Sequence, residues 1–391
     1  MEIDCKSVDR RGAASAIATA DAALHNDCAA LAGAIPLCDN ADIAARRGCT
    51  VLSFNFTQEG LPMTRFATKT SLSLAALAAS LVLAGAPALA LNTKSFISNG
   101  GNDASSCLNI LNACATIAGA LAKTNAGGEI SVVNTSDYGI ATITTAISIT
   151  NDGGGEAGII TGAHNIGIDI IAGNGDVVTL RGLNIDGQAV GRSGISIHTA
   201  NAVHIQNAVI RNMEEAGAGT GIGIVPTANV QVFIADSFIF NNGSVAATGG
   251  IVIKPGFAGH ANVTLDRVHL ENNVRGIWAD GTGAGVGFGS HVVIRESFVT
   301  GNAGDGVLAI STAAAGAAFI VLERSTITQN AGAGVHADGG HAVILLSDNT
   351  ISRNGTGVSA TTTGQVITYG NNRNNNNIGA EGVATSTFSS F

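Results

Sequence analysis

A repeat with a period of 24 to 31 residues constrains the fold more than any other feature of the chain. Short stretches of alternating apolar residues end in asparagine, and these asparagines are Asn242, Asn273, Asn302, Asn330 and Asn354. Between them recur strand-like segments that begin with glycine, such as Gly-Ile-Val-Ile at residues 250–253. Each unit holds two or three strands of period 2, too short to enclose a core alone. We therefore expect the units to stack, each strand pairing with its copies above and below.

The repeated asparagines have a physical role in such a stack. Asparagine tolerates the left-handed turn conformation, and its amide can hydrogen-bond the same residue on the next rung. The five asparagines are therefore predicted to form a structural ladder. At about 4.8 Å per rung, roughly nine rungs give a rod about 43 Å long. The predicted fold is all-β, a single-stranded parallel β-helix of roughly nine coils over residues 131–378, right-handed by the crossover rule.

The ends of the stack need covers, because the first and last rungs have no neighbour. Residues 91–130 are predicted to form an N-terminal cap with a capping helix between residues 114 and 126. The cap contains Cys107 and Cys114, an even pair that indicates a local disulfide in an exported chain rather than a zinc site. The tail 379–391 is predicted to cover the last rung with two phenylalanines, Phe388 and Phe391.

The N-terminal part of the chain has the pattern of a secretory signal peptide at residues 63–90. Arg65 and Lys69 precede a short apolar stretch, and Ala-Leu-Ala follows it, which predicts cleavage after Ala90. Signal peptides stand at the N-terminus, so we interpret residues 1–62 as a misassigned upstream extension, with translation starting at Met63. The alternative is a real leader or a small extra domain.

Charge and composition exclude some partners. The chain has 19 Lys and Arg against 28 Asp and Glu, a net charge of −9, so nucleic acid is not an expected partner. No membrane span is predicted in the mature chain, and the signal peptide places it in the periplasm, on the cell surface or outside the cell. No cofactor and no metal site are predicted, since the nine histidines do not cluster at ligand spacing.

Residues 94–378 resemble the right-handed parallel β-helix, or pectin-lyase-like, superfamily, and more narrowly its uncharacterised exported bacterial repeat proteins. The cysteine pair, Ala-Thr-Ile-Ala-Gly-Ala-Leu at 115–121, Gly-Gly-Glu-Ile at 127–130 and the Asn and Gly-Ile-x-Ile repeats carry the resemblance. It implies the fold but no single activity, because the superfamily includes lyases, hydrolases, epimerases and adhesins. The motifs of its pectin-cleaving members, such as Asn-Thr-Asp and Gly-His-Asp, are absent from the sequence.

One set of residues is a candidate site. In the Gly-Ile-x-Ile strands the alternate positions are expected to point outward, and they include Lys254, Trp278, Asp280, His336 and Asp338. The two aspartates would lie about 9.6 Å apart, near the upper spacing of an inverting carboxylate pair, and the tryptophan could stack on a sugar. The competing interpretation is solvated surface, because Asp-Gly is common in turns.

The favoured function is a non-catalytic binding or surface-structural rod at the bacterial cell envelope, with a polysaccharide or envelope glycan as partner. The first alternative is a carbohydrate-active enzyme, a polysaccharide lyase or glycoside hydrolase, with Asp280, Asp338 and Lys254 as catalytic candidates and Trp278, Asp280 and His336 as ligand-binding candidates. The second alternative is an adhesin or passenger-like domain.

Overall fold

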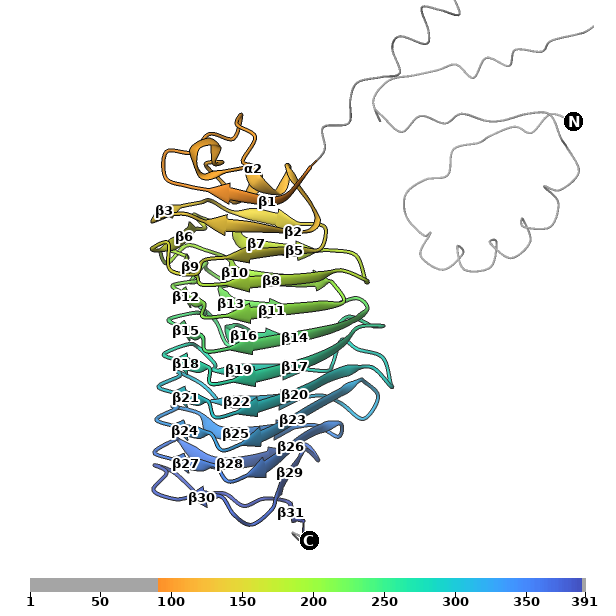
Figure 1. The fold of residues 1–391 in the computed structure, drawn as a ribbon. Helices are drawn as coiled ribbons and strands as arrows, with labels where there is room; N and C mark the ends of the chain where they lie inside the picture. Colours follow the sequence, from red (N-terminus) through yellow and green to blue (C-terminus); the bar gives the residue numbers. More distant parts are fainter. Residues whose placement is uncertain (1–90, 389–391) are drawn as a thin grey trace, which may run out of the picture. The chain divides into compact units, whose positions relative to one another are not determined.

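A computed structural model describes residues 91–388 (Figure 1). The described residues all lie in one compact unit of the chain, Ala86–Phe391. The predicted upstream extension at 1–62, the signal peptide at 63–90 with its cleavage after Ala90, and Phe391 lie outside the described residues.

Three parallel sheets, named A, B and C here, form the described part of the chain, and each coil contributes one strand to each sheet in that order. Figure 1 shows the strands stacked rung on rung from β1 to β31. Sheet A consists of β1 (Asn92–Ile97), β2 (Thr124–Val132), β5 (Ile147–Thr150), β8 (Val177–Arg181), β11 (Ala202–Gln206), β14 (Asn229–Ala235), β17 (His260–Asp266), β20 (Gly289–Arg295), β23 (Ala317–Glu323), β26 (Ala342–Ser347), β29 (Gln365–Thr368) and β31 (Ser386–Thr387). Sheet B consists of β3 (Ser136–Asp137), β6 (Ala157–Ile160), β9 (Leu183–Asp186), β12 (Val209–Arg211), β15 (Phe238–Phe240), β18 (His269–Glu271), β21 (Phe298–Thr300), β24 (Thr326–Thr328), β27 (Thr350–Ser352) and β30 (Arg373–Asn374). Sheet C consists of β4 (Ala141–Ile143), β7 (Ile166–Ile171), β10 (Ser193–Thr199), β13 (Thr220–Ile224), β16 (Gly249–Ile253), β19 (Ile277–Asp280), β22 (Val307–Ile310), β25 (Ala333–Asp338) and β28 (Thr356–Thr361).

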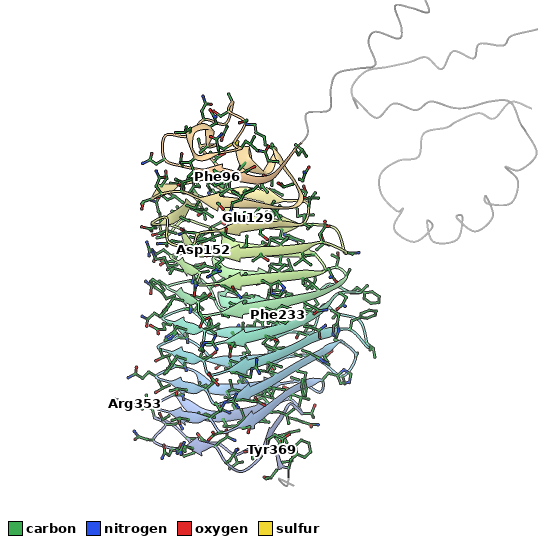
Figure 2. All side chains as sticks on the ribbon, in the orientation of Figure 1. Phe96, Glu129, Asp152, Phe233, Arg353 and Tyr369 are labelled. Atoms are coloured by element: carbon green, nitrogen blue, oxygen red, sulfur yellow. A yellow bond between two sulfur atoms is a disulfide. The ribbon has the colours of Figure 1, made fainter. Side chains whose placement is uncertain are left out.

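The register stacks like residues on like residues, which builds the core. In sheet A, Ile234 pairs with Leu265, and Leu265 pairs with Ile294, and all three are at most 1% exposed. Alternate residues of the same strands lie on the outer face, as Phe233 does (Figure 2). Because the sequence alternates with a period of two, each inward position of a strand contributes to a continuous column of apolar side chains along the stack. The predicted parallel β-helix is confirmed, with three strands in each coil.

The corner between sheets B and C contains the repeated asparagines. All five are at most 1% exposed, and each accepts a backbone N–H from the rung before it. Asn302 Nδ2 donates to Asn330 Oδ1 at 2.7 Å, and Asn330 Nδ2 donates to Asn354 Oδ1 at 2.8 Å. The ladder continues to Asn377, which accepts from Asn354 Nδ2 at 3.1 Å. These amides satisfy backbone groups that a buried corner would otherwise leave without partners.

Glycines directly follow this corner because the rungs approach one another too closely for a side chain. A Cβ on Gly276 would lie 2.5 Å from the carbonyl oxygen of Gly306 and 2.5 Å from Val299 Cγ1. A Cβ on Gly250 would lie 2.8 Å from the carbonyl oxygen of Gly276. The glycine that recurs in the repeat is therefore required by close packing of backbone on backbone.

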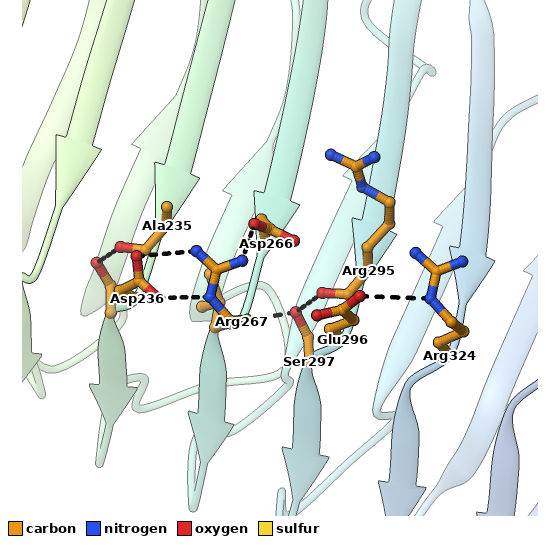
Figure 3. Close-up of polar contacts among 10 residues, drawn as sticks. Ala235, Asp236, Asp266, Arg267, Arg295, Glu296, Ser297 and Arg324 are labelled. Atoms are coloured by element: carbon orange, nitrogen blue, oxygen red, sulfur yellow. Dashed lines mark hydrogen bonds and ion pairs between the residues drawn. The ribbon is translucent and has the colours of Figure 1, made fainter.

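The corner between sheets A and B has a second polar ladder that the sequence analysis missed. Ser237, Ser297 and Ser325 are at most 2% exposed, and each hydroxyl donates to a carbonyl two residues earlier. The residue before each serine has a positive φ and carries a charged side chain on the surface. Figure 3 shows these charges paired between rungs, with Arg267 bound to Asp236 at 2.7 Å and Arg324 to Glu296 at 3.4 Å.

Both ends of the described stack are covered. At the start, Cys107 and Cys114 are disulfide-bonded with a Cα separation of 5.0 Å, next to a short 3₁₀ helix, η1 (Ile110–Asn112). The helix α2 (Ile117–Leu121) is shorter than the one expected between residues 114 and 126, because the chain enters β2 at Thr124. At the other end, β31 pairs with β29, and the Phe388 ring lies 5.9 Å from the ring of Tyr369.

Candidate functional site

The outer face of sheet C brings the candidate residues onto successive rungs. Trp278 pairs with Leu308, and Leu308 pairs with His336. One column along the face, Ile310 lies between Asp280 and Asp338, which are therefore two rungs apart. At about 4.8 Å per rung, this register agrees with the expected separation of about 9.6 Å.

Trp278 does not present its ring to solvent. The side chain is only 8% exposed and packs with Val252 and Leu308 from the neighbouring rungs. Two cations lie over its ring, with Lys254 Nζ at 5.6 Å and the Arg275 guanidinium carbon at 5.2 Å from the ring centroid. Neighbouring side chains therefore already surround the ring, and the assignment of Trp278 as a residue that stacks on a sugar stays a prediction.

Asp280 is also buried, with only 3% of its surface exposed, although its position in the strand was expected to be exposed. One carboxylate oxygen, Oδ2, lies 2.9 Å from Lys254 Nζ. The other, Oδ1, accepts from the backbone N–H of Thr282 at 2.9 Å and from its hydroxyl at 2.5 Å. Both oxygens are therefore satisfied by the protein, and the Asp-Gly turn at this position is held closed by the carboxylate.

His336 and Asp338 belong to a second network on the same face. His336 Nδ1 lies 3.1 Å from Asp305 Oδ2, and its Nε2 lies 3.0 Å from the hydroxyl of Thr361. That hydroxyl donates to Asp338 Oδ1 at 2.9 Å. Hydrogen bonds from Thr362 and Thr361 lower the pKa of Asp338 below its usual value. Burial acts to raise the pKa of Asp305, but hydrogen bonds from His336 and from the backbone N–H of Ala333 outweigh it and lower the pKa.

The chemistry available on this face follows from these contacts. A general acid or base must reach a substrate atom with a proton or a lone pair. Asp280 is enclosed, and Leu308 and Ile310 separate it from the network around His336. The contacts favour a structural role for Lys254 and Asp280, while the catalytic and ligand-binding assignments remain predictions.

Two cavities in the described residues lie apart from these candidate residues and were missed in the sequence analysis. One, of about 580 Å³, lies near the N-terminal end of sheet C and is lined in part by Asp169 and Arg192. The other, of about 420 Å³, lies where the loops leaving sheet C enter sheet A, and we call it the histidine pocket. The residues that line the histidine pocket are His260, Gly287, Phe288, His291, Ala315, Ala317, Gly340, His341 and Val343. Its histidines lie far apart in the sequence and come together only because the strands of successive coils pair in register. Aligning the repeats by that register could have revealed the pocket.

Two kinds of feature are absent from the part of the chain that the structure describes. There, no group of three or more His, Cys, Asp and Glu side chains is placed to hold a metal ion. Within residues 91–388, no helix has the length and apolar character needed to cross a bilayer.

The comparison with known proteins agrees with the architecture. A family model described as the right-handed beta helix region matches residues 145–373. The chain belongs to the right-handed β-helix family. This settles the handedness expected from the crossover rule, and it covers the coils that contain the candidate face and the histidine pocket. No curated protein matches the sequence of this β-helix chain.

Solved structures resemble the β-helix in fold. The pectate lyase Pel9A is 15% identical, with a TM-score of 0.49 over 76% of this chain and 78% of its own. A lacto-N-biosidase from Eubacterium ramulus is 10% identical, with a TM-score of 0.41 over 75% of this chain and 67% of its own. The A-module of a mannuronan C-5 epimerase from Azotobacter vinelandii is 15% identical, with a TM-score of 0.36 over 68% of this chain and 91% of its own. All three TM-scores are below 0.5, so nothing about this chain is inferred from these likenesses, and fold does not imply function.

Proposed function

We propose that the chain is an exported β-helix protein that serves as a non-catalytic binding or surface-structural rod at the bacterial cell envelope, with a polysaccharide or envelope glycan as its partner. One observation carries the non-catalytic part of this proposal. The strongest catalytic candidate, Asp280, has both oxygens engaged by Lys254 and Thr282. A carboxylate held in this way stabilises the coil, and at 3% exposed it is hardly accessible to a substrate.

Export is supported by the sequence and by the cap. The signal-peptide pattern at residues 63–90 precedes the first described strand directly, and the Cys107–Cys114 disulfide is typical of proteins that fold outside the cytosol. The ladders of buried Asn and Ser side chains tie each coil to the next, which suits a rod that works in an exposed place.

A panel of polysaccharides tests the absence of catalysis. The purified full chain is incubated with pectate, alginate, chondroitin and neutral glucans, with and without calcium, and the assay follows unsaturated products and new reducing ends. We expect neither to exceed the no-enzyme control, because the carboxylates of sheet C are engaged by the protein. Cleavage that disappears in Asp280→Ala but persists in Asp152→Ala, an exposed aspartate elsewhere, would overturn the proposal in favour of a carbohydrate-active enzyme.

The mature N-terminus tests export. In cell fractions of the natural host, we expect the protein outside the cytoplasm with Leu91 as its first residue, because cleavage is predicted after Ala90. Intact-mass measurement and N-terminal peptide sequencing provide the readout. A cytoplasmic protein that retains peptides from residues 1–62 contradicts both the export and the interpretation of that segment.

A further inference from the structure

The histidine pocket differs from four other cavities of the described residues in having no Asp, Glu, Lys or Arg in its lining. Its residues come from four successive coils, on strands β17, β20, β23 and β26 and on the loops between sheets C and A. The loops 281–288, 311–316 and 339–341 contain no Asp, Glu, Lys or Arg. Its volume of about 420 Å³ falls within the range of roughly 300–1,000 Å³ found for small-ligand sites. With no Asp, Glu, Lys or Arg in the lining, an ion would have no permanently charged partner there, so we expect a neutral occupant.

The pocket combines apolar surface with groups that form hydrogen bonds. Phe288 is 40% exposed, and Val343 and small residues line the space beside it. His341 Nδ1 lies 2.8 Å from the carbonyl oxygen of Ala315, so in the neutral ring Nδ1 carries the proton and Nε2 accepts. His291 has no recorded hydrogen bond to another described residue, and its ring lies 5.3 Å from the ring of His260 and 5.4 Å from that of Phe319.

The imidazoles suit hydroxyl groups at neutral pH. Burial, with a smaller effect of nearby His260, lowers the pKa of His291 below its ordinary value of 6.5. A neutral imidazole offers one donor and one acceptor, which is what a hydroxyl needs from its partner. The titratable side chains that line the pocket are those of His260, His291 and His341.

We infer that the histidine pocket is a binding site for a neutral saccharide unit, whose ring contacts Phe288 and whose hydroxyls bond the imidazoles of His291 and His341. A sugar ring presents one apolar face and a rim of hydroxyls, and the lining offers partners for both. This inference rests on the proposed binding function and names the class of ligand and its place.

The exposed aromatic rings of sheet B do not compete for this role. On sheet B the rings of Phe238, His269 and Phe298 stack on one another at centroid distances of 4.3 Å and 5.0 Å. The ring faces that point toward one another are therefore used within the stack. Phe298 is 45% exposed, close to the value for Phe288, which makes it a matched control that lies outside the pocket.

Calorimetric titration of the full chain tests the site. The probes are cellohexaose, xylohexaose, mannohexaose and laminarihexaose, with trigalacturonate as the charged comparator, at pH 7.5. We expect at least one neutral probe to bind and trigalacturonate not to bind. Phe288→Ala should weaken binding about tenfold, since an aromatic contact of this kind contributes that order of affinity, and Phe298→Ala should leave it unchanged.

Two further readouts make the outcome decisive. Binding should shift the imidazole NMR signals of His291, and affinity should fall at pH values below 6.5, where His291 takes up a proton and its acceptor nitrogen is lost. If Phe288→Ala does not fold, His291→Gln is the second variant. The inference is overturned if no neutral probe binds, or if the variants bind as well as the parent chain. If a glycan binds but the pocket variants do not affect its binding, the proposed function stands and only this inference fails. Cleavage of a polysaccharide, or a cytoplasmic location, would instead contradict the proposed function.

Discussion

Replacing Gly276 with alanine should lower the free energy of unfolding by about 3 kcal/mol, the upper part of the range for overpacking a well-packed interior. The new Cβ would lie 2.5 Å from the backbone oxygen of Gly306 and 2.5 Å from Val299 Cγ1. Backbone cannot move aside as a flexible side chain can, so adjacent rungs must separate. Urea denaturation followed by the fluorescence of Trp278, the sole and buried tryptophan of the chain, measures the loss.

The matched control is Gly223→Ala, in the same sheet. Gly223 lies on the outer face, and a Cβ there would have no neighbour closer than the hydroxyls of Ser193 and Ser196 at 3.9 Å. Its replacement should be neutral, or stabilising by up to about 1 kcal/mol through the unfolded chain. Equal destabilisation by Gly276→Ala and Gly223→Ala would show that close approach of the rungs is not the reason for the glycine.

Asn302→Ala should have an effect of similar size, about 3 kcal/mol, because it leaves buried polar groups without partners. Asn302 Oδ1 accepts the backbone N–H of Asn273 at 2.9 Å. Its Nδ2 donates to the carbonyl of Leu270 and to Asn330 Oδ1. No water can reach the corner to replace these bonds, since Asn302 is 1% exposed. The same urea titration measures the change.

Asn262→Ala is the control for this substitution. Asn262 lies on the outer face of sheet A and bonds Asn229 at 3.3 Å, where solvent can replace the contact, so its removal should change stability by less than about 0.5 kcal/mol. Hydrogen exchange adds a local readout, because the Asn273 amide should lose protection only in Asn302→Ala. An unchanged exchange rate of the Asn273 amide would show that its bond to Asn302 does not protect it, and would argue that the ladder does not stabilise this corner.

The fold could be predicted because its determinants recur. A period-2 apolar pattern, an asparagine and a glycine at fixed places in each unit specify a stack without any knowledge of long-range contacts. Pairing of Asp280 with Ile310, and of Ile310 with Asp338, followed from the same repeat. The serine ladder was missed because a polar residue such as Ser237 is expected on the surface. Its side chain is buried because Asp236, the residue before it, has a left-handed backbone conformation.

The candidate site was less predictable, because burial on the outer face depends on neighbours that the repeat does not encode. Alternation correctly placed Trp278 outside the main core, but it could not show that Lys254 and Arg275 lie over the ring. The histidine pocket depends on loops of different lengths meeting across coils. Only the register brings His260 next to His291.

The connections between the sheets differ in how much their lengths vary from coil to coil. Between sheets A and B, every coil from β14 to β27 uses two residues, such as Asp236 and Ser237. Between sheets C and A, the connections 254–259, 281–288, 311–316 and 339–341 have unequal lengths although the strands they join stay in register. Insertions and deletions at that edge are therefore nearly neutral for the scaffold. Evolution, or an engineer, can diversify recognition there one loop at a time while the rest of the sequence stays fixed.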